Sequence, residues 1–258
     1  MASGIIESPK MDPLSARWTR RIERAADLER EIPAALELLR FYRAIAQFQQ
    51  EIATAGLPPG PFSARPAQIP EVLRGYPGRL LLLLDRHAPA PLARAAETMS
   101  HADDWDPADP ASRFVAKAVV QPYAEYCAQR CYTAPPHVRT SSCPFCGDRP
   151  VCSVLRPEGE GGKRSLLCSL CFTEWEFNRV RCPACATEDK DALPLYNAEQ
   201  LPHIRIEACD VCHTYLKCVD LTRNGLAIPE VDEIGAVALD VWAAENGYTK
   251  LQENLFAL

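Results

Sequence analysis

Helical spacing of apolar positions dominates the first half of the chain. Across residues 13–53 apolar side chains recur at intervals close to three, four and seven, with Arg and Glu between them, which is typical of amphipathic helices. Pro33 lies inside this run and predicts either a break or the first turn of a second helix. Further helical pattern is found at residues 80–85, 92–99 and 112–131, the last with an expected kink at Pro122.

The pattern changes near Pro135 to short β-prone runs separated by turn residues. Two hairpins, each followed by a third strand, are the predicted arrangement. The predicted strands are residues 151–156, 163–168 and 172–178 in the first unit, and 193–197, 203–208 and 215–220 in the second. An apolar stretch at 231–244 predicts one buried helix, and Gly247 is its expected stop.

These patterns predict an α+β chain made of a mostly helical N-terminal domain, two tandem β units that resemble one another, and a C-terminal helix. The expected parts are a helical domain at 1–137, a first four-cysteine ribbon at 138–178, a second four-cysteine ribbon at 179–225, and a helical segment at 226–258 that packs on the body.

Cysteine changes this picture most. The chain has 12 cysteines in 258 residues, all between Cys127 and Cys218. Eight of them form four C-x-x-C pairs, which are Cys143 with Cys146, Cys168 with Cys171, Cys182 with Cys185, and Cys209 with Cys212. Two intervening residues let both sulfurs of a pair reach one ion, and two facing pairs complete a tetrahedral site.

The spacing of the four pairs indicates how they combine. The first and second pairs are 21 residues apart, the second and third 10, and the third and fourth 23, so each long gap has room for a hairpin. Sequential pairing is therefore favoured, while interleaved pairing (first with third, second with fourth) remains open. We expect two metal ions, and four sulfur ligands suit either iron or zinc.

The remaining cysteines and the histidine beside a pair have simpler interpretations. Cys127 and Cys131 share a helix face, and a role as small core residues is favoured over a reactive pair. Cys152 and Cys218 fall in predicted strands as core residues. His213 adjoins Cys212 but is expected beside the site rather than in it.

Motifs and charge exclude several classes of function. Four thiolates close each site, and no nucleotide-binding, protease or hydrolase signature occurs, so the chain is predicted not to be an enzyme. Residues 138–220 hold ten basic and twelve acidic side chains, which argues against nucleic acid as a partner. No export signal opens the chain and no apolar run is long enough to cross a bilayer, so we expect a cytoplasmic chain without membrane insertion.

The ordered motifs CPFCG, CSLC with Glu174 and Trp175, CPAC and CDVCHTYLK, behind a helical half, resemble the FdhE family of formate dehydrogenase accessory proteins. Residues 231–248 fit this family as well. One departure is Ala186, where a glycine is common, and it concerns the geometry of the second site rather than its ligands.

This resemblance implies a cytoplasmic accessory factor with two rubredoxin-like or zinc-ribbon-like units and with iron as the metal, zinc being the alternative. The implied partner is the catalytic subunit of a respiratory molybdenum- or tungsten-dependent formate dehydrogenase, matured before export. We expect a monomer or weak homodimer whose partner surface lies between the helical half and the ribbons. An electron-transfer protein of the rubredoxin type is the alternative, since iron held by four cysteines is redox-active.

Overall fold

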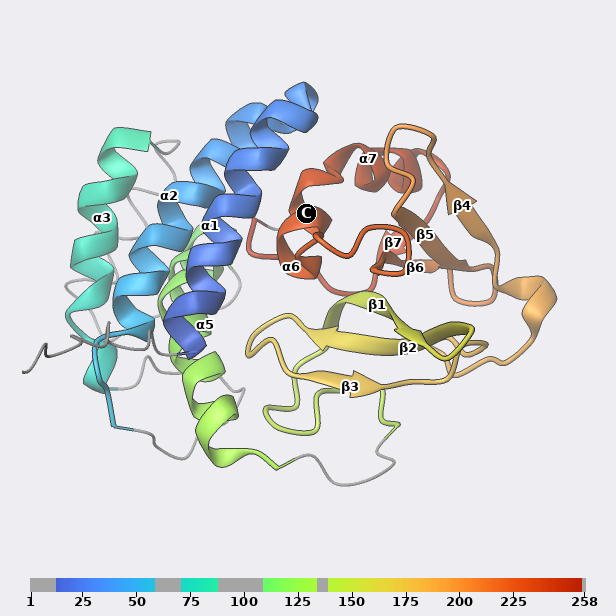
Figure 1. Cartoon of the computed structure of the whole chain (residues 1–258), viewed down its shortest axis with the longest axis horizontal. Helices are drawn as coiled ribbons and strands as arrows, with labels where there is room; N and C mark the ends of the chain where they lie inside the picture. The colour runs from blue at the N-terminus through green and yellow to red at the C-terminus, as the bar shows by residue number, and fades with distance from the viewer. Residues whose placement is uncertain (1–12, 59–70, 88–108, 134–138, 257–258) are drawn as a thin grey trace, which may run out of the picture.

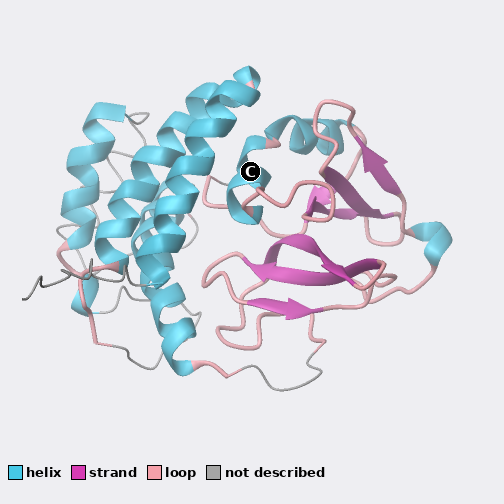
Figure 2. Cartoon of the chain, viewed as in Figure 1, coloured by secondary structure: helices cyan, strands magenta, loops and turns pink. Residues whose placement is uncertain are grey.

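The computed structural model describes residues 13–58, 71–87, 109–133 and 139–256. Its helical half and its sheet lie side by side (Figures 1 and 2). The elements of the helical half are α1 (Pro13–Glu31), the 3₁₀ turn η1 (Pro33–Ala35), α2 (Leu36–Ala53), η2 (Glu71–Leu73), α3 (Tyr76–His87) and α5 (Pro110–Cys131). Among the described residues, no helix combines the length and the apolar character needed to span a membrane.

The helices follow the sequence pattern closely. The break expected at Pro33 is confirmed, because α1 ends at Glu31 and Pro33 opens the next turn. Asp109 caps α5 by accepting a hydrogen bond from the Ser112 amide at 2.8 Å, a favourable N-cap arrangement. This helix continues through Pro122 to Cys131. The helix expected at residues 92–99 lies outside the described part of the chain.

All the described strands form one sheet. They are β1 (Pro150–Glu158), β2 (Gly161–Cys168), β3 (Glu174–Glu176), β4 (Leu195–Asn197), β5 (Ile204–Cys209), β6 (Thr214–Asp220) and β7 (Thr249–Lys250), with a short 3₁₀ turn η3 (Lys190–Ala192) before β4. Their order is β3-β2-β1-β6-β5-β4, and β7 pairs with β6.

Both predicted hairpins and both third strands are present, but the two units merge. Neighbours within each unit are antiparallel, whereas β1 and β6 pair in parallel, with Cys152 opposite Lys217. A parallel pairing between distant strands leaves no local sequence signal, because each strand looks the same whichever neighbour it receives. The two ribbons are thus halves of one continuous sheet.

The C-terminal helical segment expected at residues 231–244 is present, but it is divided into two helices. The segment forms α6 (Pro229–Gly235) and α7 (Val237–Glu245), separated at Ala236, whose φ of −87° and ψ of 32° are not helical. A Cβ on Gly235 would lie 3.2 Å from Leu28 of α1, so the end of α6 presses closely on that helix. The turn after it lets α7 leave α1 and reach β5.

The hydrophobic core is continuous between the two halves. One cluster joins Leu14 and Trp18 of α1 to Val154 and Val219 of the sheet and to Ile234 of α6. Each of these side chains is at most 3% exposed. The helix α6 contacts α1 on one side and β1 and β6 on the other. The sheet that carries the cysteine pairs is therefore held rigidly against the helical half.

Candidate metal centres

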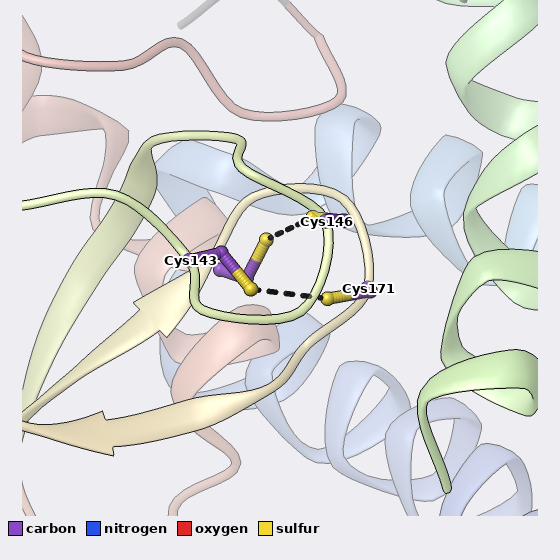
Figure 3. Close-up of side chains that lie close together, drawn as sticks. Cys143, Cys146 and Cys171 are labelled. Atoms are coloured by element: carbon purple, nitrogen blue, oxygen red, sulfur yellow. Dashed lines mark hydrogen bonds between the residues drawn. The ribbon is translucent and has the colours of Figure 1, made fainter. Parts of the chain in front are cut away.

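The cysteine pairs gather as two groups of four, each within one β unit. In the first group the ligand atoms of Cys143, Cys146, Cys168 and Cys171 all lie within 4.8 Å of one another, and in the second those of Cys182, Cys185, Cys209 and Cys212 do the same. The sulfurs are therefore grouped sequentially along the chain. Figure 3 shows Cys143, Cys146 and Cys171 pointing inward from the loops that face each other in the first group.

Each pair lies on a tight loop closed by backbone hydrogen bonds. The Gly147 amide donates to the Cys143 carbonyl at 2.9 Å, and the Cys143 amide donates to the Asp148 carbonyl at 2.8 Å. The second unit repeats this, since the Ala186 amide donates to the Cys182 carbonyl at 3.0 Å. These backbone hydrogen bonds hold each loop in the shape that brings both sulfurs of a pair to one side.

The residue after each pair has a positive φ. The four values are 82° at Gly147, 53° at Phe172, 64° at Ala186 and 54° at His213. Glycine adopts this conformation without penalty, whereas an L side chain is strained there by roughly 1–2 kcal/mol. Ala186 keeps the geometry that glycine provides at the corresponding position of the first unit. The departure noted in the sequence thus strains this loop without changing its shape.

The sulfur spacing fits a tetrahedral metal ion. Cys143 and Cys171 sulfurs are 3.6 Å apart, and Cys146 and Cys168 sulfurs are 3.4 Å apart. In the second group the corresponding distances are 3.7 Å and 3.6 Å. Four thiolates about 2.3 Å from one ion are separated by roughly 3.8 Å, whereas a disulfide requires about 2.05 Å. The donor set and spacing therefore suit iron or zinc and leave no coordination position for a substrate.

A threonine hydroxyl lies beside the last cysteine of each group. Thr173 Oγ1 is 3.1 Å from Cys171 Sγ, and Thr214 Oγ1 is 3.0 Å from Cys212 Sγ. A hydroxyl placed in this way can donate to a metal-bound thiolate and reduce its charge. The sequence reasoning missed these residues, although a repeated C-x-T at both places is a signal that could have revealed them.

The two sites differ in their exposure to solvent. All four cysteines of the first group are buried, and they belong to a core cluster that includes Phe114 of α5 and Trp175 of β3. In the second group Cys185 is exposed and Cys212 is half-buried. A ligand exchanger or redox partner in solution can therefore approach the second site, whereas the first lies inside the core.

The other cysteines and the neighbouring histidine lie outside both groups. Cys127 is buried in the helical core and Cys131 is exposed at the end of α5. Cys152 and Cys218 are fully buried in β1 and β6. The His213 ring lies 6.4 Å from the Tyr248 ring, centroid to centroid.

A buried ion pair joins the two ribbons between the sites. The Arg164 guanidinium of β2 donates to Glu207 Oε2 of β5 at 2.6 Å. It also donates, at 2.7 Å, to the carbonyl of Asn178, which lies just after β3. Burial alone raises the pKa of Glu207, but the charges of Arg164 and Arg205 outweigh it and lower this pKa to about 2. Glu207 is therefore a carboxylate at neutral pH, and it fixes one ribbon against the other.

A second buried cation ties the first site to the helical half. The Arg21 guanidinium of α1 contacts both the Trp18 and the Phe172 rings, 4.4 Å from each centroid. Phe172 is the positive-φ residue that follows Cys171. Arg21 also donates to Glu125 of α5 at 2.6 Å and to Glu230 of α6 at 2.5 Å. The first site is thus connected through one side chain to three helices.

The lysine of the CDVCHTYLK motif serves the fold. Lys217 is fully buried, with its Nζ 2.9 Å from Glu233 Oε1 and 2.5 Å from Asp240 Oδ2. Burial alone would raise the pKa of Glu233, but Lys217 and Lys250 outweigh it and lower this pKa to about 2. Lys217 therefore anchors β6 to α6 and α7.

Fold and site together define a class: a helical half joined to two tandem four-cysteine ribbon units that share one sheet. Two domain families match this part of the chain, "FdhE, central domain" over residues 142–179 and "FdhE, C-terminal domain" over residues 180–257. Residues 142–257 therefore match the two FdhE domains, as the cysteine motifs in this part of the chain indicated.

Individual relatives agree with this assignment. A protein named "Protein FdhE homolog" from Aquifex aeolicus is 38% identical over 113 residues, and one from Haemophilus influenzae is 33% identical over 114 residues. These matches cover 43% and 44% of this chain but only 40% and 37% of the relatives. The crystal structure of the FdhE protein from Pseudomonas aeruginosa matches with a TM-score of 0.73 at 23% identity, over 94% of this chain and 96% of that one. That likeness extends the shared fold to the helical half.

Proposed function

We propose that this chain is a cytoplasmic accessory protein that matures a respiratory molybdenum- or tungsten-dependent formate dehydrogenase by binding its catalytic subunit. The observation that carries the proposal is the pair of closed four-cysteine groups within FdhE domains. Because each group uses four sulfurs on one ion, its chemistry is structural or redox rather than hydrolytic. Binding of a partner, without turnover, is the role that such a chain can fill.

The eight cysteines of the two groups are the proposed ligands of two metal ions, with iron proposed and zinc the alternative. Bound metal would supply folding free energy at both sites and, if it is iron, the capacity to carry one electron. The chain's own contribution is to hold the thiolates at the right spacing, through the loops closed at Cys143 and Cys182 and the hydroxyls of Thr173 and Thr214.

The proposal is tested by formate dehydrogenase activity in the membrane fraction of cells that lack this protein. We expect activity to disappear and to return with the plasmid-borne gene, while the catalytic subunit is still made. A matched control plasmid carries Cys131→Ser, since Cys131 is exposed and lies outside both groups. Unchanged activity in the cells without the gene would contradict the proposal.

A second candidate, electron transfer, is favoured by the exposure of the second site. Cys185 is exposed and Cys212 is half-buried, so an electron could pass to a partner docked there. Metal analysis of the protein purified from anaerobically grown cells separates the two functions. Zinc at full occupancy of both sites would exclude the electron-transfer candidate and leave the accessory role untouched.

A further inference from the structure

The two β units repeat one another, and the repeat leaves one edge open. Each unit runs in the order cysteine pair, strand, strand, cysteine pair, strand, so β4 in the second unit corresponds to β1 in the first. The outer edge of β1 is covered by β6, which pairs with it in parallel. In the described part of the chain the corresponding edge of β4 has no strand beside it, as its outermost place in Figure 1 shows.

The backbone of β4 is prepared for another strand. Tyr196 lies opposite Ile206 of β5, and the Ala208 amide donates to the Pro194 carbonyl at 3.1 Å. Hydrogen-bonding groups alternate in direction along an antiparallel strand, so the amides and carbonyls of Leu195 and Asn197 point away from β5. Unpaired groups of this kind are a template for strand addition.

An apolar groove follows one face of β4. It has a volume of about 800 Å³, and its walls include Tyr196 and Leu201 from the second ribbon and Trp242 from α7. Residues 31–34, at the end of α1 and in η1, close its other side. The Tyr196 and Trp242 rings lie 4.6 Å apart. This groove lies between the helical half and the second ribbon, where the sequence led us to expect the partner.

A basic cavity lies on the other face. Its volume is about 290 Å³, and five basic side chains and one acidic side chain line it. The acid, Glu207, is already bonded to Arg164 and Arg205. The Nε atoms of Arg181 and Arg205 are buried and have no hydrogen-bond partner among the described residues, although Arg181 Nε lies 3.8 Å from Glu188 Oε1. Leu195, 54% exposed, lines both this cavity and the groove.

The opposite edge of the sheet is protected. Glu174 and Glu176 of β3 form ion pairs with Arg156 and with Arg139 and Lys163, respectively. Charges along an edge strand oppose pairing with another chain. The residues of β4 are Leu195, Tyr196 and Asn197, and none of them is charged. Another strand can therefore pair with the β4 edge, whereas the charges of β3 oppose pairing at the opposite edge.

We propose that the β4 edge binds an extended segment of the partner protein as an additional strand. Side chains of a strand alternate between its two faces. We therefore expect the sequence of the segment to alternate between apolar and acidic residues. The apolar side chains would enter the apolar groove, and the acidic side chains would enter the basic cavity. The inference rests on the proposed function for the identity of the partner. The binding mode follows from the backbone and side chains of β4.

The experiment measures binding of the purified formate dehydrogenase catalytic subunit to the full chain. Asn197→Pro removes an outward amide of β4 and leaves the hydrogen bonds to β5 intact. Glu176→Pro makes the matched change on β3, where Leu166 pairs with Trp175 and the amide of Glu176 points outward. Losing an edge hydrogen bond and disturbing its neighbours should weaken binding about tenfold in the β4 variant only.

Amide hydrogen exchange on the unaltered chain gives an independent readout. Partner binding should slow exchange about tenfold at Leu195 and Asn197, with little change at Tyr196, whose amide already faces β5. The inference would be overturned if Asn197→Pro and the unaltered chain bind the catalytic subunit with equal affinity and the amides of Leu195 and Asn197 gain no protection from exchange. The proposed function would still stand in that case. If the catalytic subunit does not bind the unaltered chain at all, both are overturned.

Discussion

The contrast in burial between the two cysteine groups leads to a prediction about matched ligand substitutions. Cys146 and Cys185 hold the same position in their units, each the second cysteine of its first pair and each followed by a positive-φ residue. Cys146 is 7% exposed and packs in the helical core, whereas Cys185 is exposed. Replacing either one with Ser removes one of four thiolates, so the chemical change is identical at the two sites.

The consequences for stability should differ. At Cys185 the new hydroxyl is solvated, and the main loss is affinity for the ion. At Cys146 the hydroxyl must also be buried, which costs about 1–3 kcal/mol, and loosening of the first site disturbs the core between α5 and β3. For a chain of this size about 1 kcal/mol corresponds to roughly 2–4 °C in Tm. We therefore expect Cys146→Ser to unfold about 2–12 °C below Cys185→Ser.

Thermal unfolding followed by circular dichroism, with metal content measured on the same samples, tests this prediction. A chelator added to the unaltered protein should remove the metal of the second site faster than that of the first, with Cys131→Ser as the control. The reasoning is refuted if Cys185→Ser unfolds at the same temperature as Cys146→Ser or below it, or if the first site releases its metal sooner.

Three further predictions concern the loops and the buried charges. Ala186→Gly relieves a backbone strain of roughly 1–2 kcal/mol but gives the unfolded chain more conformational freedom. It should therefore stabilise the folded protein by about 0.5–1 kcal/mol. A lower free energy of unfolding in urea would show that the positive φ of Ala186 is not strained. Arg21→Met removes the buried cation that Glu125 and Glu230 share and leaves Glu125 only its ion pair with Arg17. This change should cost about 3–5 kcal/mol in denaturant unfolding, whereas Arg40→Met, at an exposed ion pair, should change stability by less than about 1 kcal/mol. The pKa of Glu207 is lowered to about 2, so its ion pair with Arg164 is fully formed above about pH 4.5. There the pair stabilises the fold by about 3 kcal/mol, and this stabilisation is lost as the pH falls towards 2. The stability difference between Glu207→Gln and the unaltered protein should shrink over that range, and a difference independent of pH would show that Glu207 is not a buried carboxylate.

Local features of this fold could be predicted from the sequence, and non-local ones could not. The break at Pro33 and both ribbon hairpins followed from spacing and turn residues, which act over a few positions. The joining of β1 to β6 did not, because parallel pairing depends on how two complete units pack. The helix break at Ala236 was missed for a similar reason, since the close packing of Gly235 against α1 beside it joins distant parts of the chain.

The candidate sites show the same division. Grouping of the eight cysteines into two sequential sets was the favoured interpretation of the gap lengths, and the structure has that grouping. The buried partners around the sites carry no such signal, because Arg164, Glu207 and Arg21 look like ordinary surface charges in the sequence. Their burial becomes visible only when segments from both halves of the chain are brought together.

The link between α1 and α6 also bears on the order of folding during synthesis. Arg21 and its partner Glu230 are 209 positions apart, and every cysteine of the two groups lies between them in the sequence. A chain emerging from the ribosome therefore exposes all eight thiolates before the acidic side chains of α6 exist to receive the guanidinium of α1. Long-range contacts of this kind form late. We expect metal to be acquired by an open chain, and the contact between α1 and α6 to form after the buried first site is loaded.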